Sequence, residues 1–139
     1  MIIETMEKEG KNIIFVYTTC SSLEEAKDIG FSAVNEKIAI SADYWLVNSI
    51  YPWKGVIQEG DQYMLLIATQ KSRSEELIKH IETRHSYEVP VIAIFKSIMT
   101  SQMYGFWVDN TLTNKDKYIS ETEAEAKNQA EGYHYSRLK

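Results

Sequence analysis

The feature that most limits the possible folds of this chain is a pair of long strand-like runs, residues 38–51 and 56–69, joined by Pro52-Trp53-Lys54-Gly55. Runs rich in β-branched and aromatic residues on either side of a short turn segment predict a β-hairpin. Gly60-Asp61 is an alternative position for the turn, and the sequence does not exclude it. Pro52 has no amide hydrogen for a sheet hydrogen bond, so we expect it at the turn or at an edge bulge.

Two capping boxes predict helices on either side of this hairpin. Ser22 is followed three residues later by Glu25, and the apolar residues beyond them recur at the spacing of one helix face. Ser72 and Glu75 repeat the pattern and begin the second predicted helix. Gly30 lies on the inner side of the first helix, where we expect it to let helix and sheet approach closely.

Two further apolar runs complete the order of the elements. Residues 12–18 are apolar on both faces and predict a central, buried strand, and residues 89–95 predict a fourth strand that begins near Pro90. The resulting order, β-α-β-β-α-β, predicts an α+β protein with a ferredoxin-like antiparallel sheet and two helices on one face. We place this domain at residues 1–113, closed by a short amphipathic helix or turn over residues 104–112.

Residues 114–139 form a polar C-terminal tail with few large aliphatic side chains. Residues 120–131 have the composition of an Ala/Glu helix, but an isolated helix of this length is marginal in water. We therefore expect a tail that is mobile or docked on a partner, and not an integral part of the domain.

Composition excludes several classes of function. A net charge of -5 argues against nucleic acid and anionic membranes as partners, since both require a basic surface. No apolar stretch approaches the roughly 18 residues of a membrane helix. Cys20 is the only cysteine and cannot form an internal disulfide, and residues 1–10 are acidic, unlike a signal peptide. We expect a cytoplasmic protein.

The predicted hairpin is too long for the domain that carries it. A strand of about 14 residues at about 3.3 Å per residue spans roughly 45 Å, whereas a compact chain of this size has a diameter of roughly 35 to 40 Å. The distal half carries a dense set of large apolar residues: Tyr44, Trp45, Leu46, Val47, Ile50, Tyr51, Trp53, Val56 and Ile57. We expect a second copy of the chain to cover them in a closed symmetric oligomer. The alternative is a hairpin that bends across its own sheet at a bulge.

Short stretches along the domain match a known family in order and spacing. They are Val16-Tyr17-Thr18-Thr19, Glu36-Lys37-Ile38-Ala39, Ser49-Ile50-Tyr51, Trp53-Lys54-Gly55, Ile67-Ala68-Thr69, His85-Ser86-Tyr87-Glu88-Val89-Pro90 and Phe106-Trp107-Val108. With these stretches the chain resembles the CutA family of divalent-ion tolerance proteins over about residues 12–113.

The resemblance implies a ferredoxin-like protomer in a compact homotrimer, similar in architecture to the PII signalling proteins, with strand pairing between subunits. It also implies a part in the tolerance of copper and other divalent ions. The family counterparts of His85 and Tyr87 line clefts between subunits. We expect these two residues and Trp53 to bind a small ligand or a divalent cation, Cu or Zn.

The chain also departs from the family pattern. Ser41 replaces a cysteine, Ala68 a lysine, Ser86 a proline, and Val91 and Lys54 each replace an acid. Because several of these positions supply polar groups to the family's cleft, the alternative function is a non-catalytic trimeric scaffold or signalling module whose ligand site is degenerate.

Other residues with metal-binding or nucleophilic side chains show no ligand spacing: Cys20, His80, His85 and His134. We interpret His80 as one half of a solvent-exposed pair with Glu76, and Cys20 as a small loop residue, with a reactive thiol as the alternative. Met99 and Met103 are predicted to fill gaps in the core and not to bind Cu(I).

Catalysis finds no support in the sequence, which has no glycine-rich phosphate loop and no nucleophile elbow. The paired acids Glu24-Glu25 and Glu75-Glu76 lie in the first turns of predicted helices, where they complement the helix dipole. We predict that the protein is not an enzyme.

Overall fold

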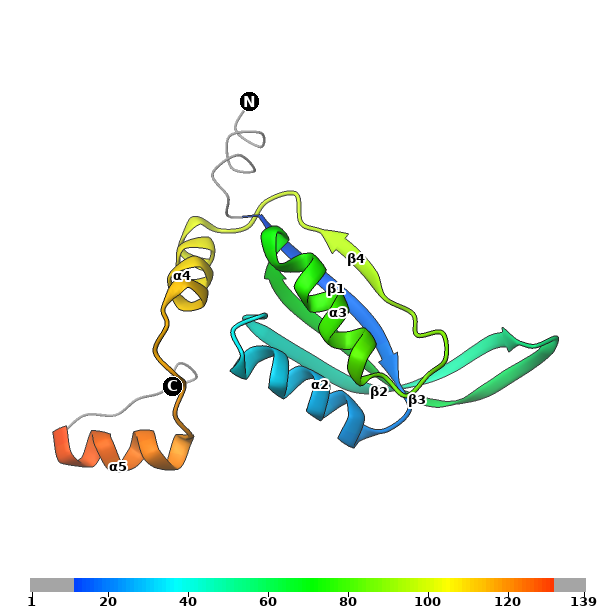
Figure 1. The fold of residues 1–139 in the computed structure, drawn as a ribbon, viewed down its shortest axis with the longest axis horizontal. Helices are drawn as coiled ribbons and strands as arrows, with labels where there is room; N and C mark the ends of the chain where they lie inside the picture. The colour runs from blue at the N-terminus through cyan, green and yellow to red at the C-terminus, as the bar shows by residue number, and fades with distance from the viewer. Residues whose placement is uncertain (1–11, 132–139) are drawn as a thin grey trace.

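The computed structural model describes residues 12–131, and it contains a four-stranded antiparallel sheet with two helices across one face (Figure 1). The acidic residues 1–10 and His134 lie outside the described residues. The elements in chain order are β1 (Ile13–Cys20), α2 (Leu23–Asn35), β2 (Ser41–Trp53), β3 (Val56–Gln70), η1 (Lys71–Arg73), α3 (Ser74–Arg84), β4 (Ala93–Lys96), α4 (Gln102–Thr113) and α5 (Glu121–Glu131).

The strand order in the sheet is β2-β3-β1-β4, and every neighbouring pair is antiparallel. This arrangement confirms the predicted ferredoxin-like α+β fold. β1 is central because its side chains are apolar toward both faces. β4 is shorter than predicted and begins at Ala93, three residues after Pro90. No helix within residues 12–131 is long and apolar enough to cross a membrane.

The β2–β3 hairpin turns at Lys54 and Gly55. Their φ angles, 49° and 80°, fit a type I′ turn, which suits the natural twist of a two-stranded ribbon. Gly60 pairs with Ser49 inside the ladder, so the alternative turn at Gly60-Asp61 is excluded. The register runs without interruption from Ser41 opposite Ala68 to Trp53 opposite Val56, and the hairpin therefore has no bulge. Pro52 lies on the edge strand β2 and pairs with Ile57, so it is at the sheet edge but at neither the turn nor a bulge.

The outer part of the hairpin extends past the rest of the sheet. β1 ends where Cys20 pairs with Tyr63, so every pair from Val47–Gln62 to Trp53–Val56 has no third strand beside it. This part of β2 and β3 projects away from the helices in Figure 1. Its apolar side chains are exposed, and Ile57 is 77% accessible. A bend back across the sheet, the alternative to assembly, does not occur.

The helices α2 and α3 cover the central part of one face of the sheet. Ile14, Val16, Leu65 and Ile67 point to this face and are buried with apolar residues of both helices. Gly30 permits this packing, since a Cβ atom there would lie 2.9 Å from the Cβ of Ala42. The prediction for Gly30 is confirmed.

The opposite face of the sheet is covered only at one end. There α4 packs Val108 and Leu112 against Ile13 and Ala68. Aromatic side chains continue along the uncovered remainder of this face, where Trp45 and Phe95 are exposed and Phe15 and Tyr17 are half-buried. The protomer thus leaves a second apolar surface in water, next to the outer hairpin.

The two helices begin differently. Ser22 caps α2, and its hydroxyl accepts a hydrogen bond from the Glu25 amide at 3.1 Å. The second capping box is wrong, because residues 71–73 form a 3₁₀ turn and α3 begins at Ser74 without a side-chain cap. The hydroxyl of Ser74 donates to the carbonyl of Lys71. Residues 71–73, which the prediction placed at the start of the second helix, instead form the turn between β3 and α3.

Three side chains differ from the sequence-based interpretation. His80 is only 5% exposed, and its Nε2 lies 2.8 Å from the Ser32 hydroxyl, so it does not form a solvent-exposed pair with Glu76. Met99 and Met103 are not core residues, since Met103 is 82% exposed. Met99 lies between β4 and α4, and Met103 lies in the first turn of α4, both with their side chains exposed.

Part of the predicted tail contacts the domain. Lys37, which has a φ of 61°, places its Nζ near the carbonyls of Thr111 and Asn114 and 4.5 Å from the ring centre of Tyr118. Residues 121–131 form the helix α5. A division of the chain at residue 113 remains a prediction.

Candidate functional site

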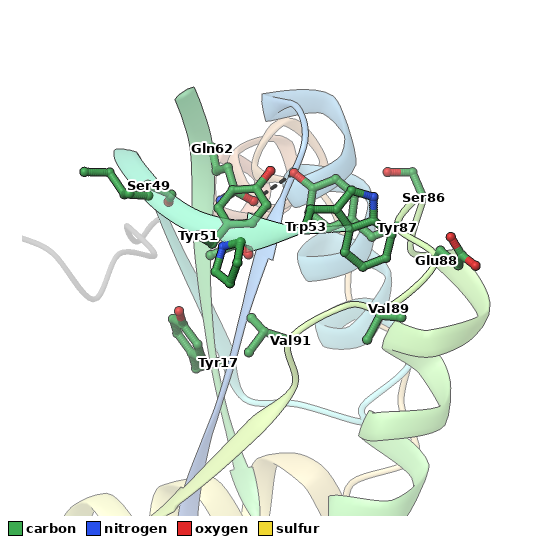
Figure 2. A pocket seen from close by; sticks show the side chains of 13 residues that line it. Tyr17, Ser49, Tyr51, Trp53, Gln62, Ser86, Tyr87, Glu88, Val89 and Val91 are labelled. Atoms are coloured by element: carbon green, nitrogen blue, oxygen red, sulfur yellow. Dashed lines mark hydrogen bonds between the residues drawn. The ribbon is translucent and has the colours of Figure 1, made fainter. Parts of the chain in front are cut away.

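A cleft of about 820 Å³ opens where the outer hairpin leaves the sheet (Figure 2). One wall comes from the hairpin, with Tyr51 and Trp53, and the other from the loop between α3 and β4, with Tyr87 and Val91. Tyr17 of β1 also lines the cleft. Four aromatic side chains, Tyr17, Tyr51, Trp53 and Tyr87, thus line the cleft together with smaller polar and apolar ones, and the cleft exists because β2 and β3 continue beyond β1.

Tyr87 is fixed inside the cleft by a side chain from β3. Its hydroxyl donates a hydrogen bond of 2.8 Å to Oε1 of Gln62, which is buried (Figure 2). Burial raises the pKa of Tyr87, and the nearby Tyr51, Glu25 and Cys20 act in the same direction. Tyr87 is thus a neutral hydrogen-bonding group that is held in one orientation.

His85 stands behind Tyr87 and does not line the cleft. Its side chain is fully buried, and its ring centre lies 5.0 Å from that of Tyr87. Nε2 lies 2.8 Å from the carbonyl oxygen of Thr19 and 3.2 Å from the hydroxyl of Thr18. A carbonyl oxygen can only accept, so Nε2 carries a proton and donates it.

Glu25 connects the first turn of α2 to the same loop. Its Oε1 lies 3.3 Å from His85 Nδ1 and accepts from the Ser86 amide at 3.3 Å, while Oε2 accepts from the Ser21 hydroxyl at 3.0 Å. From the sequence, we predicted only that the Glu25 carboxylate complements the dipole of this helix. The structure shows that it also anchors the α3–β4 loop.

Cys20 is the last residue of β1 and is fully buried, not a loop residue. Burial, together with the charge of Glu25, raises the pKa of its thiol to about 12. A thiol with such a pKa is protonated at neutral pH, which argues against the reactive-thiol alternative. Within residues 12–131, Cys20, Glu25 and His85 form one group whose ligand atoms all lie within 4.8 Å of one another.

The predicted site residues are thus brought together in part. Trp53 and Tyr87 line the cleft, whereas His85 supports it from behind. Gln62 and Tyr51 were missed. Gln62 is the last residue of the polar stretch 58–62 in β3, and nothing local distinguishes it from its neighbours or predicts its contact with Tyr87.

The positions that depart from the family pattern fall into two groups. Ser86 and Val91 line the cleft. Ser41 and Ala68 pair with each other at the other end of β2 and β3 and do not line it. Lys54 lies in the turn, where its Nζ is 3.9 Å from Glu88 and 5.5 Å from the ring centre of Trp53.

The fold and the cleft define a ferredoxin-like protein with a long hairpin and an aromatic site beside it. The family model described as CutA1 divalent ion tolerance protein matches residues 14–111. The chain therefore belongs to the CutA1 divalent ion tolerance family.

Relatives in sequence carry the same family name. Protein CutA, chloroplastic, of Arabidopsis thaliana is 31% identical over 112 residues, which are 78% of this chain and 62% of that protein. The divalent-cation tolerance protein CutA of Archaeoglobus fulgidus is 26% identical over 98 residues, which are 70% of this chain and 96% of that protein. The chain thus spans nearly all of the archaeal relative but less than two thirds of the plant one.

Solved structures agree with the fold. The periplasmic divalent cation tolerance protein CutA from Archaeoglobus fulgidus superposes with a TM-score of 0.70 at 25% identity, over 72% of this chain and 98% of that one. CutA1 from Pyrococcus horikoshii gives a TM-score of 0.69 at 26% identity, over 73% and 99% of the two chains.

Proposed function

We propose that this CutA-family chain works as a homotrimer with an architecture like that of the PII signalling proteins. In this proposal it acts in copper and other divalent-ion tolerance by binding an ion or small ligand in clefts between subunits. It catalyses no reaction. We also propose that it resides in the cytoplasm.

The observation that supports assembly is the pair of adjoining apolar surfaces on the protomer. The outer hairpin exposes Ile50 and Ile57, and the uncovered sheet face exposes Trp45 and Phe95. Exposed apolar groups of this density mark interaction surfaces. In a trimer with a threefold axis, each chain would present one of these surfaces to one neighbour and the other surface to the next.

Light scattering coupled to size exclusion tests the assembly. We expect a solution mass of three chains that does not change on dilution through the micromolar range. A mass of one chain at high concentration, with well-behaved elution, contradicts the trimer.

The aromatic cleft supports the binding part of the proposal. Cleft sites that bind small ligands are mostly apolar, with a few fixed polar groups, and here Gln62 and Tyr87 supply such groups. A neighbouring chain that covers the outer hairpin would close the cleft, because Tyr51 and Trp53 belong to both.

Tryptophan fluorescence with Cu²⁺ as the probe tests the cleft. We expect saturable quenching that is largely lost in Trp53→Phe and retained in Trp107→Phe, since Trp107 lies on α4 outside the cleft. Equal quenching in the two variants contradicts copper binding at this position.

The alternative function is the trimeric scaffold with a degenerate ligand site. The apolar side chain of Val91 in the cleft favours it. A stable trimer that shows no saturable heat or quenching with Cu²⁺ or Zn²⁺ supports this alternative over the first.

A further inference from the structure

Three aromatic side chains of the cleft project from the same face of the sheet. Tyr17 of β1 pairs with Leu66 of β3, which pairs in turn with Asp43 of β2. Paired residues point to the same face, and so do residues at even spacing along one strand. Tyr51 and Trp53 follow Asp43 at even spacing on β2, so they share the face of Tyr17. The strand register thus gathers three aromatic rings along one wall of the cleft.

The charge that lines the cleft is negative. Among the described residues that line it, Glu88 is the only aspartate, glutamate, lysine, arginine or histidine. It directly follows Tyr87 on the α3–β4 loop (Figure 2). An anionic ligand such as a phosphate would meet no compensating charge from these residues, whereas a cation would meet a carboxylate beside aromatic rings. The net charge of -5 on the whole chain acts in the same direction.

The protein already holds a cation of its own at this position. Nζ of Lys54 lies 5.5 Å from the ring centre of Trp53 and 3.9 Å from Oε2 of Glu88. A cation within about 6 Å of a ring centre is attracted to the negative face of the ring. The side chains of Lys54 and Glu88 are both largely exposed, so their ion pair contributes little to stability and exchanges readily for another partner. Lys54 therefore marks the place where the ammonium group of a ligand would bind.

We propose that the cleft binds a small organic cation whose methylated ammonium group takes the place of the Lys54 Nζ between Trp53 and Glu88. The inference deepens the small-ligand part of the proposed function and rests on it. A quaternary ammonium group has no N–H to be satisfied, so it leaves water at a smaller cost than a primary one. Its methyl groups would contact apolar side chains of the cleft such as Pro52 and Val89.

The aromatic rings are held in place before any ligand arrives. The hydrogen bond of 2.8 Å from the Tyr87 hydroxyl to Gln62 fixes the ring on the loop side. On the hairpin side, Trp53 directly precedes the tight turn at Lys54 and Gly55. A site whose side chains are already ordered loses less conformational entropy on binding.

Proton NMR titration of the full chain with choline tests the proposal. We expect the N-methyl signal of choline to move upfield and to saturate, because protons above the face of an aromatic ring are shielded. The matched probe is 3,3-dimethylbutan-1-ol, which has the same shape with a carbon atom in place of the charged nitrogen. We expect this neutral alcohol to bind at least about fivefold more weakly than choline.

Two substitutions should change the affinity for choline in opposite directions. Glu88→Gln removes the carboxylate and should weaken binding by at least about threefold. Lys54→Gln removes the competing ammonium group and should strengthen binding by about two- to threefold. Glu82→Gln is the matched control, because Glu82 is exposed on α3 outside the cleft and loses the same charge. It should leave the affinity unchanged.

Several outcomes overturn the proposal. These are equal binding of choline and the neutral alcohol, an affinity that Glu88→Gln does not lower, and an affinity that Lys54→Gln does not raise. Circular dichroism establishes that each variant is folded. Failure of the trimer appears separately as a one-chain mass, and failure of the copper site as quenching that Trp53→Phe does not reduce, and neither measurement enters the choline titration.

Discussion

Glu25 shows how much a single side chain can connect in this protein. Its amide is part of the cap of α2, while its carboxylate holds the Ser86 amide and approaches His85. The start of one helix and the loop that follows the other are thereby joined at one carboxylate. Substitutions here affect the loop that bears Tyr87 as well as the helix.

Gly30→Ala should destabilise the protein, against the usual preference of helices for alanine. The change favours a helix by about 1 kcal/mol, but here the new Cβ would lie 2.9 Å from the Cβ of Ala42 and 3.4 Å from Leu65. Overpacking of this kind costs about 1 to 3 kcal/mol, so we expect a net loss of about 1 kcal/mol in urea unfolding.

Gly60→Ala provides the comparison, because nothing lies within 4 Å of the added Cβ. We expect it to be neutral or slightly stabilising. If Gly30→Ala instead raised the free energy of unfolding by about 1 kcal/mol, as the same change does at an exposed helix position, the close approach of α2 to the sheet would be refuted.

His80 should make the stability of the protein depend on pH. Burial lowers the pKa of His80, and the neighbouring Arg84 contributes in the same direction. Between the ordinary histidine pKa of about 6.5 and this lowered value the unfolded chain binds more protons than the folded one, so stability rises with pH. The contribution is complete above about pH 6.5 and is lost as the pH falls through the lowered pKa.

Urea unfolding at pH 7.5 and pH 5.5 measures this effect. We expect wild type to lose more stability between the two pH values than His80→Gln does. Identical losses in the two proteins would show that His80 is not held neutral in the folded state.

At the scale of elements, the hairpin depends on its turn. Lys54 and Gly55 both adopt positive φ, a conformation that costs most residues free energy and that glycine and asparagine tolerate. The turn sets the register of the entire ribbon, and the register decides which side chains face the cleft.

Gly55→Ala should therefore destabilise the hairpin by about 1 kcal/mol, whereas Lys54→Asn should stabilise it by creating the favoured Asn-Gly turn. Thermal unfolding of the two variants measures the difference. The Lys54 change also removes the ion pair with Glu88, but both groups are exposed and such pairs contribute little. A lower melting temperature for Lys54→Asn than for Gly55→Ala would be inconsistent with a type I′ turn.

At the scale of the whole molecule, the protomer is asymmetric in what it covers. Two helices bury one sheet face, while the other face and the outer hairpin keep large apolar groups in contact with water. A chain that has its own core but leaves such surfaces open is typical of subunits that assemble.

The double variant Ile50→Lys and Ile57→Lys should disrupt assembly, because it places charges among the apolar groups of the outer hairpin. We expect light scattering to give a mass of one chain with the circular dichroism of the fold retained. Phe31→Lys is the control, since Phe31 is 75% exposed on the outer side of α2. A variant hairpin that still forms trimers, or a Phe31 change that abolishes them, would locate the interface elsewhere.

Local patterns in the sequence were enough to predict the elements and their order. β1 was predicted because residues 12–18 are apolar on both faces, and α2 because Ser22 and Glu25 satisfy its first amides. The hairpin turn remained ambiguous, since both glycine-containing segments fit the pattern. Propensity, capping and periodicity act over a few residues, so a single sequence displays them directly.

Burial and the meeting of distant side chains were decided only by the tertiary structure. The four-residue spacing predicted that His80 forms an exposed pair with Glu76. In the structure, the packing of α3 against α2 buries His80 beside Ser32. Cys20, Glu25 and His85 are brought together by three connections that no local pattern describes. The sequence determined which elements form, because short-range forces select them. Only the packing of those elements decided which polar groups leave water and which partners they meet, because both depend on contacts between residues far apart in the chain.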